Sequence, residues 1–472
     1  MSLRPVAVRR LLALLVAASG CAGGAPATTP APAPAPTQGR TGLAPGVPAG
    51  ADLTGFDVVG LYRQMGLLAS GFPMPFVGSV AYLGGRSADS TLALVTLSLA
   101  NRSLGFIREG DRYAASYSVT LEARRGDAPL ARMTTTETVR VTSFKETGRT
   151  DESVIFEQLL VLPPGEADIT VTVRDEGSGR VGTAIRSVVV PTLTGRSALG
   201  TPVPFYQATL RPSLDTLPRL VPSPRSTVVF GRDSVVPVYL EAYGPGDRVT
   251  LRARVETEGA TLFVDSLPLV RRTPGLFSGV FTVPVRRLGI GVTTIAFART
   301  DAPADTASVP VFVSFGDDLP VASFEQMLNY LRYFASPTRI RALREVAPEQ
   351  RAEAWARFVT ASDPAPITPE HEGLRQYFQR IQTANLRFRD EGQQGWLTDR
   401  GMVYITLGEP EQVRETNPMD VGSRGRALVW DYPSRRVTLV FIDQTGFGRW
   451  RLSIQSQGDF QAIARAVQER NG

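Results

Sequence analysis

Few residues in this 472-residue chain have the chemistry of a catalytic or metal-binding centre. His371 is the single histidine and Cys21 the single cysteine. Zinc sites use Cys, His and carboxylate ligands at short, fixed spacings, and the sequence contains no such cluster. A serine nucleophile would have to use His371 as its base, but no Gly-x-Ser-x-Gly turn occurs. We therefore expect no catalytic residue, no metal and no cofactor.

Two other patterns have an ordinary structural explanation. Glu409 and Glu411 flank Pro410 and have the spacing of an acid–base pair. They are predicted to lie where a short helix begins, a place where acidic side chains interact favourably with the helix dipole. Leu288–Gly291 contains two glycines inside a β region, but no phosphate-binding Gly-x-x-x-x-Gly-Lys-Ser/Thr loop is present, so we expect no nucleotide.

The most unusual stretch is the heptapeptide Gly-Trp-Leu-Thr-Asp-Arg-Gly at residues 395–401. Its tryptophan fits either a platform for a sugar or peptide, or a ring wedged between a helix ending at Phe388 and the following sheet. Its threonine and aspartate fit either a ligand site or a turn fixed by nearby backbone N–H groups. Its arginine is expected to pair with the adjacent aspartate or with a helix carboxylate. We favour the structural role for the whole motif, which consists of Gly395, Trp396, Thr398, Asp399, Arg400 and Gly401.

This heptapeptide resembles the signature of the GWxTD domain family of bacterial proteins. The resemblance extends upstream to Trp355, Phe358, the Asp363–Pro369 segment, Tyr377, Arg380 and the pairs Ala384-Asn385 and Arg387-Phe388. It extends downstream to Trp430-Asp431-Tyr432, Phe441-Ile442-Asp443 and Gly446. His371-Glu372 departs from the pattern, because family members often carry Asn-Glu there. The resemblance implies an envelope setting and no particular reaction.

Residues 1–21 are predicted to be an export signal. Three arginines precede the apolar run Leu11–Ala18, which is far shorter than the ~20 residues that a membrane-spanning helix needs. The small residues before Cys21 resemble the lipid-attachment site of bacterial lipoproteins, and a plain secretory signal is the alternative. The expected attachment to the membrane is therefore through lipid on Cys21. Ala22 provides no inner-membrane retention signal, which favours the outer membrane.

Residues 22–54 are predicted to be a disordered tether, because their Ala-Pro repeats favour extended polyproline-like conformations and bury little apolar surface. The formal net charge of the chain is +6, and it falls to +3 if Arg4, Arg9 and Arg10 are removed with the signal. This excess is too small and too evenly spread to predict binding to nucleic acid.

Residues 55–191 are predicted to form a first β-sandwich, with a short helix at its N-terminal end. From Tyr113 to Ala123, apolar residues alternate with mostly polar ones, as in a strand with one solvent-exposed face. Six further strands are expected at Phe76–Tyr82, Ser90–Leu99, Arg132–Val141, Val154–Leu162, Ala167–Val173 and Ile185–Val190. Seven short strands separated by turn signals indicate an antiparallel, immunoglobulin-like sandwich.

A Pro-rich connector is predicted over residues 192–225, followed by a second sandwich over residues 226–318. The expected strands of this sandwich are Val236–Leu240, Val249–Val255, Val280–Val283, Thr293–Phe297 and Val309–Val313. The predicted fold class is therefore multidomain and mainly β, with two antiparallel immunoglobulin-like sandwiches.

Residues 319–394 are predicted to be helical and residues 395–472 to form a C-terminal α+β module. Ser336-Pro337, Ala347-Pro348 and Thr368-Pro369 are the expected helix starts. His371 is expected to be a solvated or capping residue near the last of these starts. The module is predicted to be an antiparallel meander with strands at Met402–Leu407, Ala427–Tyr432, Val437–Ile442 and Trp450–Ile454, closed by a helix from Phe460 to Val467.

These features favour a non-catalytic, lipid-anchored envelope protein whose C-terminal module binds a protein partner. A glycan-binding lipoprotein is the alternative, and it requires exposed aromatic rings at Trp396, Trp430, Tyr432 and Trp450. A hydrolase of unrecognised type is a third hypothesis, which would need a cleft with several perturbed carboxylates.

Overall fold

The computed structural model describes residues 57–149, 154–314, 323–364, 371–388, 393–416 and 426–471. The predicted signal, Cys21, the tether and Thr368 lie outside the described residues. Within the described ranges, no helix is both long enough and apolar enough to span a membrane.

The first sandwich consists of two antiparallel sheets. The first has the strand order β1-β2-β3-β7, with bounds Leu68–Ser70, Phe76–Gly84, Thr91–Leu99 and Val154–Leu162. The second has the order β4-β5-β8-β9, with bounds Ile107–Glu109, Arg112–Arg125, Gly165–Asp175 and Val181–Val190, and β6 (Ala128–Val141) also pairs with β5. All seven predicted strands are confirmed, and the short helices are α1 (Val58–Gln64) and α2 (Phe144–Thr147). Alternate residues of β5, including Tyr117, Val119 and Leu121, are buried in the core of this sandwich, as the period of two predicts.

The prediction that residues 192–225 form only a connector is wrong. They contain the strands β10 (Ala198–Leu199), β11 (Val203–Thr209) and β12 (Arg219–Pro222). β10 and β11 pair with β14, and β12 pairs with β11 at the edge of the sheet. An edge strand tolerates proline because the missing N–H breaks no hydrogen bond to a neighbouring strand. Val203 and Leu220 belong to one buried cluster with Leu83 and Leu92 of the first sandwich.

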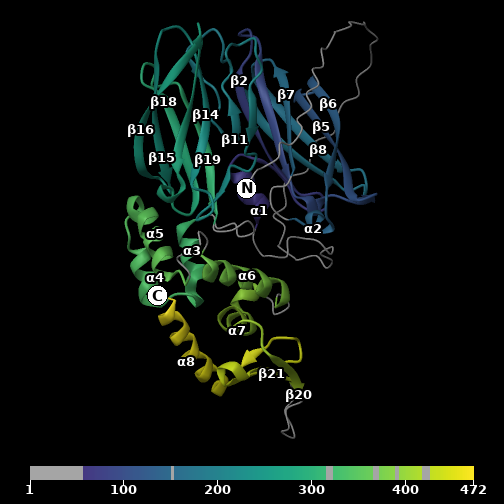
Figure 1. Cartoon of the computed structure of the whole chain (residues 1–472), viewed down its shortest axis with the longest axis vertical. Helices are drawn as coiled ribbons and strands as arrows, with labels where there is room; N and C mark the ends of the chain where they lie inside the picture. Colours follow the sequence, from purple (N-terminus) through teal and green to yellow (C-terminus); the bar gives the residue numbers. More distant parts are fainter. Residues whose placement is uncertain are drawn as a thin grey trace, which may run out of the picture. The chain divides into compact units, whose positions relative to one another are not determined.

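The second sandwich has the strand order β12-β11-β14-β17-β16-β15-β18-β19-β13. Its strands, among them β14, β15 and β18, are drawn in teal in Figure 1. The bounds from β13 to β19 are Thr227–Val229, Val235–Tyr243, Val249–Thr257, Ala260–Thr273, Leu276–Pro284, Gly291–Arg299 and Thr306–Ser314. The five predicted strands are confirmed, and β13 pairs in parallel with β19. The long strand β16 is not predicted from the sequence because Leu269 is its one buried residue, which leaves little apolar alternation.

A fully buried ion pair lies among strands of both sandwiches. Arg211 Nε lies 2.9 Å from Glu241 Oε1, and both side chains are 0% exposed. The hydroxyl groups of Tyr239 and Tyr243 donate hydrogen bonds to Glu241, and Arg211 Nη2 donates one of 2.8 Å to the backbone oxygen of Gly84. Because a buried charge is tolerated only when it is paired and hydrogen-bonded, these five residues stabilise one another.

The remaining chain combines helices with a small sheet. The helices are α3 (Phe324–Tyr330), α4 (Pro337–Arg344), α5 (Arg351–Ser362), α6 (Glu372–Arg387), α7 (Asp399–Leu407) and α8 (Ile454–Arg470). The antiparallel sheet has the order β20-β21-β22-β23, with bounds Gln412–Thr416, Arg426–Tyr432, Val437–Asp443 and Arg451–Leu452. Ser336 caps α4 as predicted, and Pro348 begins a single 3-10 turn that leads into α5.

The prediction of a strand at Met402–Leu407 is wrong, because these residues belong to α7. Their alternation predicts a strand, but α7 has buried residues on several sides and so has no polar stripe that would reveal a helical period. Thr398 caps the start of α7, and Gly408 ends it with a φ of 89°. A capping threonine before this segment and a glycine with positive φ after it are both signals of helix ends, so they favour a helix over a strand here.

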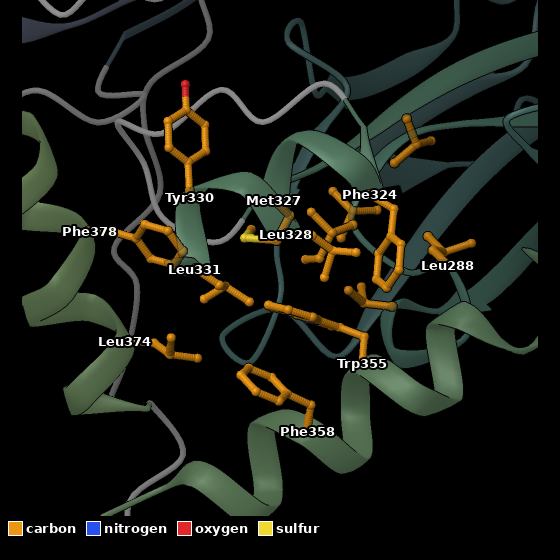
Figure 2. Packing of buried hydrophobic residues seen from close by; sticks show 14 of the residues in the cluster. Leu288, Phe324, Met327, Leu328, Tyr330, Leu331, Trp355, Phe358, Leu374 and Phe378 are labelled. Atoms are coloured by element: carbon orange, nitrogen blue, oxygen red, sulfur yellow. The ribbon is translucent and has the colours of Figure 1, made fainter. Parts of the chain in front are cut away.

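A shared core joins the second sandwich to the helices and the small sheet. Trp355 of α5 lies between Phe324 of α3 and Phe358 of its own helix (Figure 2). Trp355 stacks on Phe358 with 5.4 Å between ring centroids, and Leu288 of the sandwich belongs to the same cluster. The predicted domain boundary at residues 318–319 therefore does not separate two cores.

Glu258 links the tip of a sandwich hairpin to two helices. It lies in the turn between β15 and β16 with a φ of 50°, a conformation that non-glycine residues seldom adopt. Its carboxylate accepts a hydrogen bond of 3.0 Å from Phe324 N and forms an ion pair with Arg351. The turn thus supplies an acceptor to the first backbone N–H of α3.

We predict that Glu241→Gln lowers the free energy of unfolding by about 3–5 kcal/mol, because it leaves the buried Arg211 guanidinium without a counter-ion. Urea denaturation followed by circular dichroism measures this change. Asp247→Asn is the matched control, because it breaks an ion pair with Arg271 that lies at the surface. Equal stabilities of the two variants would contradict the prediction.

Candidate functional site

Trp396 of the motif is held on every side by its own chain. Its backbone N–H donates to Asn385 Oδ1 (3.0 Å) and its ring Nε1–H donates to Gln394 Oε1 (2.7 Å). Its ring packs against Tyr330 at 4.9 Å and against Tyr333 at 6.2 Å between centroids. The ring is buried, as predicted, but its described ring contacts are with the end of α3 and the turn after it, and not with the helix ending at Phe388 and the sheet.

The two glycines of the motif allow close contact between backbones. A Cβ on Gly395 would lie 2.0 Å from the carbonyl oxygen of Ala384 in α6. A Cβ on Gly401 would lie 1.8 Å from the carbonyl oxygen of Gly395. Both distances are far below van der Waals contact, so the fold requires glycine at each position.

Thr398 fixes the turn between these glycines. Its Oγ1–H donates to the Gly395 carbonyl oxygen (2.8 Å), and its Oγ1 accepts from Gly401 N (2.9 Å). The second bond is the N-cap of α7. Thr398 is fully buried, so its hydroxyl is used inside the fold and faces no solvent.

Asp399 and Arg400 connect α7 to the last hairpin. Asp399 accepts hydrogen bonds from Leu452 N (2.8 Å) and Arg451 Nη1 (3.2 Å), so Arg451 is its ion-pair partner. The guanidinium of Arg400 lies over the ring of Trp450, 5.7 Å from its centroid. These contacts hold β23 against the start of α7.

Asp443 organises the turn between β22 and β23. Its carboxylate is 0% exposed and accepts from Gly446 N (3.0 Å), Gly448 N (2.8 Å) and the Thr445 hydroxyl (3.1 Å). Burial by itself raises the pKa of Asp443, but the hydrogen bonds from Gly448, Thr445, Arg426 and Gly446 outweigh burial and lower the pKa below its usual value. The carboxylate therefore stays ionised and holds the turn.

The four candidate binding aromatics are all buried. Trp396, Trp430, Tyr432 and Trp450 are between 2% and 6% exposed. Trp430 packs against Phe441 with 4.8 Å between ring centroids, and the Tyr432 hydroxyl donates to the Gly408 carbonyl oxygen. These rings cannot form an exposed platform, so the glycan-binding role assigned to them is wrong.

Comparison with protein families identifies this region. The model of the GWxTD domain matches residues 299–438. The chain contains a GWxTD domain. The matched region begins at the end of β18 and runs into β22, so the GWxTD domain includes helices α3–α7 as well as the heptapeptide. The domain is thus larger than the module predicted at residues 395–472 and starts within the second sandwich.

Similarity to solved structures is weak. The red sea bream transglutaminase is 10% identical, with 50% of this chain and 31% of that chain covered at a TM-score of 0.15. The fibronectin(III)-like modules of Clostridium thermocellum CbhA are 12% identical (52% and 94% covered, TM-score 0.13), and the native E. coli alpha-2-macroglobulin is 14% identical (50% and 16% covered, TM-score 0.16). The search of curated proteins finds no significant match.

His371 is a buried N-cap of α6 in the GWxTD domain, so the expectation of a solvated side chain is wrong and that of a cap is correct. Its Nδ1 accepts from Leu374 N (3.0 Å), which requires the neutral ring with its proton on Nε2. Nε2 then donates to Ser362 Oγ (3.1 Å), and Ser362 Oγ–H donates to the Phe358 carbonyl oxygen (2.8 Å). Burial lowers the pKa of His371.

The acidic pair and the glycine pair have structural contacts. Glu409 forms an ion pair with Arg387, and Glu411 Oε1 accepts from Ser434 N (3.1 Å). Both glutamates follow the C-terminal end of α7, so the expectation that they open a helix is wrong. Gly289, with a φ of 76°, lies between β17 and β18 beside Ala352 of α5.

Among the residues that the structure describes, no group of three His, Cys, Asp or Glu side chains is placed to hold a metal ion.

Sequence reasoning missed the partners of the motif. Asn385, Tyr330 and Tyr333 hold Trp396, and Arg451 pairs with Asp399. The contact of Asn385 could have been anticipated, because a polar side chain in the buried stripe of a helix needs a hydrogen-bond partner. The tyrosines and Arg451 lie too far away in the sequence for spacing to reveal their contacts.

We predict that Gly395→Ala lowers the free energy of unfolding by about 3 kcal/mol or more, because the new methyl group collides with the Ala384 carbonyl in a packed core. Gly458→Ala is the matched control. Gly458 lies inside α8 with open space around its Cβ position, so alanine should stabilise the helix by about 0.5–1 kcal/mol. Chemical denaturation measures both, and equal effects would contradict this account of the motif.

We predict that His371 contributes less to stability as the solution becomes acidic. Its lowered pKa means that the unfolded chain binds the proton first, so the contribution is full above about pH 6.5 and is lost as the pH falls through the lower pKa of the folded state. His371→Asn keeps a capping acceptor and does not titrate. The difference in unfolding free energy between the two proteins should therefore shrink below pH 6.5. The single imidazole NMR signal should titrate below 6.5, and a higher midpoint would contradict the prediction.

Proposed function

We propose that this GWxTD protein is a lipid-anchored protein of the bacterial envelope, located in the outer membrane. We further propose that its C-terminal region, residues 299–471, binds a protein partner and catalyses no reaction. The hydrogen bonds that the motif makes within its own chain support the proposal of a binding, non-catalytic region. The side chains of Trp396, Thr398 and Asp399 all bond to their own chain, so they serve the shape of the region.

The titratable groups of the region also support a binding role. A general acid at neutral pH needs a carboxyl group with a raised pKa. In the described part of the chain, the carboxyl groups with a resolved shift are Asp301, Asp431 and Asp443, and each has a lowered pKa. Hydrogen bonds from Thr438 and Arg414 lower the pKa of Asp431. These carboxylates act as acceptors that fix structure.

The observation that carries the proposal is the exposed strand β20. All five of its residues are exposed, and among the described strands only β21 pairs with it. Val413, on this strand, presents an apolar side chain that is half exposed. An edge strand with free N–H and C=O groups is a common place for a protein segment to dock by β-pairing.

The anchor is supported by the sequence of the N-terminal segment. Cys21 follows a short apolar run and small residues, and a Pro-rich stretch comes after it. Attachment of acyl chains to Cys21 would hold the protein at a membrane surface, since covalent lipid contributes about 0.8 kcal/mol for each buried CH₂ group.

The test is recovery of the intact chain from native membranes through a C-terminal affinity tag. We expect the protein in the membrane fraction, bound to a specific envelope protein, and we expect Cys21→Ser in the soluble fraction. Val413→Asp places a charge on β20 and should reduce recovery of that partner at least roughly tenfold, the effect of losing about 1.4 kcal/mol.

Val189→Asp is the matched control, since Val189 is an exposed valine of β9 in the first sandwich. It should retain the partner. If the intact chain recovers no protein partner, or if Cys21→Ser stays in the membrane, the corresponding half of the proposal fails. Recovery of glycan alone would contradict the proposal of a protein partner.

A further inference from the structure

The turn between β22 and β23 presents an unusually exposed aromatic side chain. Phe447 is 85% exposed, and among the described residues no other phenylalanine or tyrosine is as exposed. The turn lies beyond the part of the chain that the family model matches, which ends at residue 438. Exposure of a large ring stabilises no fold, since burial of apolar surface is what favours folding.

This turn is nevertheless fixed in position. The buried carboxylate of Asp443 collects the N–H groups of Thr445, Gly446 and Gly448 at 2.8–3.3 Å, so the backbone on both sides of Phe447 is bonded to one anchor. Gly446 and Gly448 have φ values of 74° and 83°, which glycine adopts without strain. Phe447 therefore projects from a pre-organised turn.

The GWxTD motif supports the other end of this hairpin. Asp399 accepts from Leu452 N and pairs with Arg451, and Arg400 lies over the ring of Trp450. Arg426 of β21 lies over the same ring at 5.3 Å from its centroid and contacts Asp443 at 3.4 Å. The motif thus positions the strand that follows Phe447.

Arginines predominate among the exposed charged side chains around Phe447. Arg426, Arg449 and Arg451 are exposed beside the turn, whereas the carboxylate of Asp443 is fully buried. Arg426 already pairs with Glu415 and Asp443, and Arg451 already pairs with Asp399, which leaves Arg449 as the arginine of this group best placed to bind a partner's carboxylate. A surface with a central aromatic ring and arginines at its rim has the composition of a protein interface with a strong central contact.

We propose that Phe447 is the anchor of a docking surface for a protein whose matching feature is an apolar pocket with a carboxylate at its rim. The inference rests on the proposed function and adds the surface and the chemistry of the partner. A rigid ring loses little conformational entropy when it binds, so the pre-organised turn favours affinity. A carboxylate at the pocket rim would pair with Arg449.

The first test replaces Phe447 with the photo-crosslinker p-benzoylphenylalanine in the intact chain, in native membranes. Phe144 is the matched control site, because it is another exposed phenylalanine (73%) and lies in the first sandwich. We expect a discrete protein adduct from position 447 and none from position 144. Mass spectrometry should map the attachment to apolar residues with acidic neighbours in the partner.

The second test measures the affinity of the purified partner for variants of the intact chain. Phe447→Ala should weaken binding at least roughly tenfold, and Arg449→Glu should weaken it more at low salt than at high salt. Phe144→Ala should bind like the unchanged protein. The melting temperature of Phe447→Ala should be unchanged, because the ring is not part of the core.

Three results would overturn the inference. The first is undiminished affinity of Phe447→Ala for a partner that Val413→Asp loses, which would leave the proposed function intact and place the interface elsewhere. The second is an adduct of position 447 with phospholipid, or with a basic or polar surface of the partner. The third is failure of the intact chain to retain any protein partner, which would overturn the proposed function as well.

Discussion

The backbone of Gly395 lies so close to α6 that no side chain fits between them, and the C-terminal region depends on this contact. Close approach brings the N–H of Trp396 to Asn385 and turns the indole ring against Tyr330. Thr398 then fixes the turn through its hydrogen bonds with Gly395 and Gly401, and it caps the start of α7. Each later contact, including that of Asp399 with β23, follows from the position of α7.

A shared core explains why the GWxTD domain extends across several predicted units. Trp355, Trp396 and Trp430 lie in one continuous core that begins in the second sandwich and ends in the small sheet. Because these side chains pack in one core, removal of any large ring leaves a cavity lined by its neighbours and lowers the stability of the whole unit. The second sandwich and the helices therefore form a structural unit, and Glu258 and Arg351 add a polar contact at its surface.

The sequence was informative where a pattern is local. The alternation in β5 predicts a strand because one face of that strand is buried, and Ser336-Pro337 predicts a helix start because capping involves neighbouring residues. Prediction from the sequence failed where burial on several sides leaves no polar stripe, as in the helix at Met402–Leu407. It also failed where exposure leaves too few apolar positions to alternate, as in β16.

Predictions for the candidate site also succeeded for local patterns and failed for distant contacts. A structural role for Trp396 and Thr398 followed from residue type and position, since a large ring and a short polar side chain beside a turn favour core packing and capping. Contacts between residues distant in the chain were out of reach, and these include Arg451 with Asp399 and Tyr330 with Trp396. The rigidity of the Phe447 turn likewise depends on the direction in which Asp443 points, which spacing does not specify.

The central claim is that the GWxTD motif positions the last hairpin, and hydrogen exchange of the intact chain tests it most directly. Asp399→Ala removes the acceptor for Leu452 N, and Asp459→Ala, on the exposed face of α8, is the control. The account predicts faster exchange across residues 443–452 in Asp399→Ala, unchanged exchange in β3 of the first sandwich, and no change in the control. Unchanged exchange in the hairpin of Asp399→Ala would contradict it, because the hairpin would then hold its position without the motif.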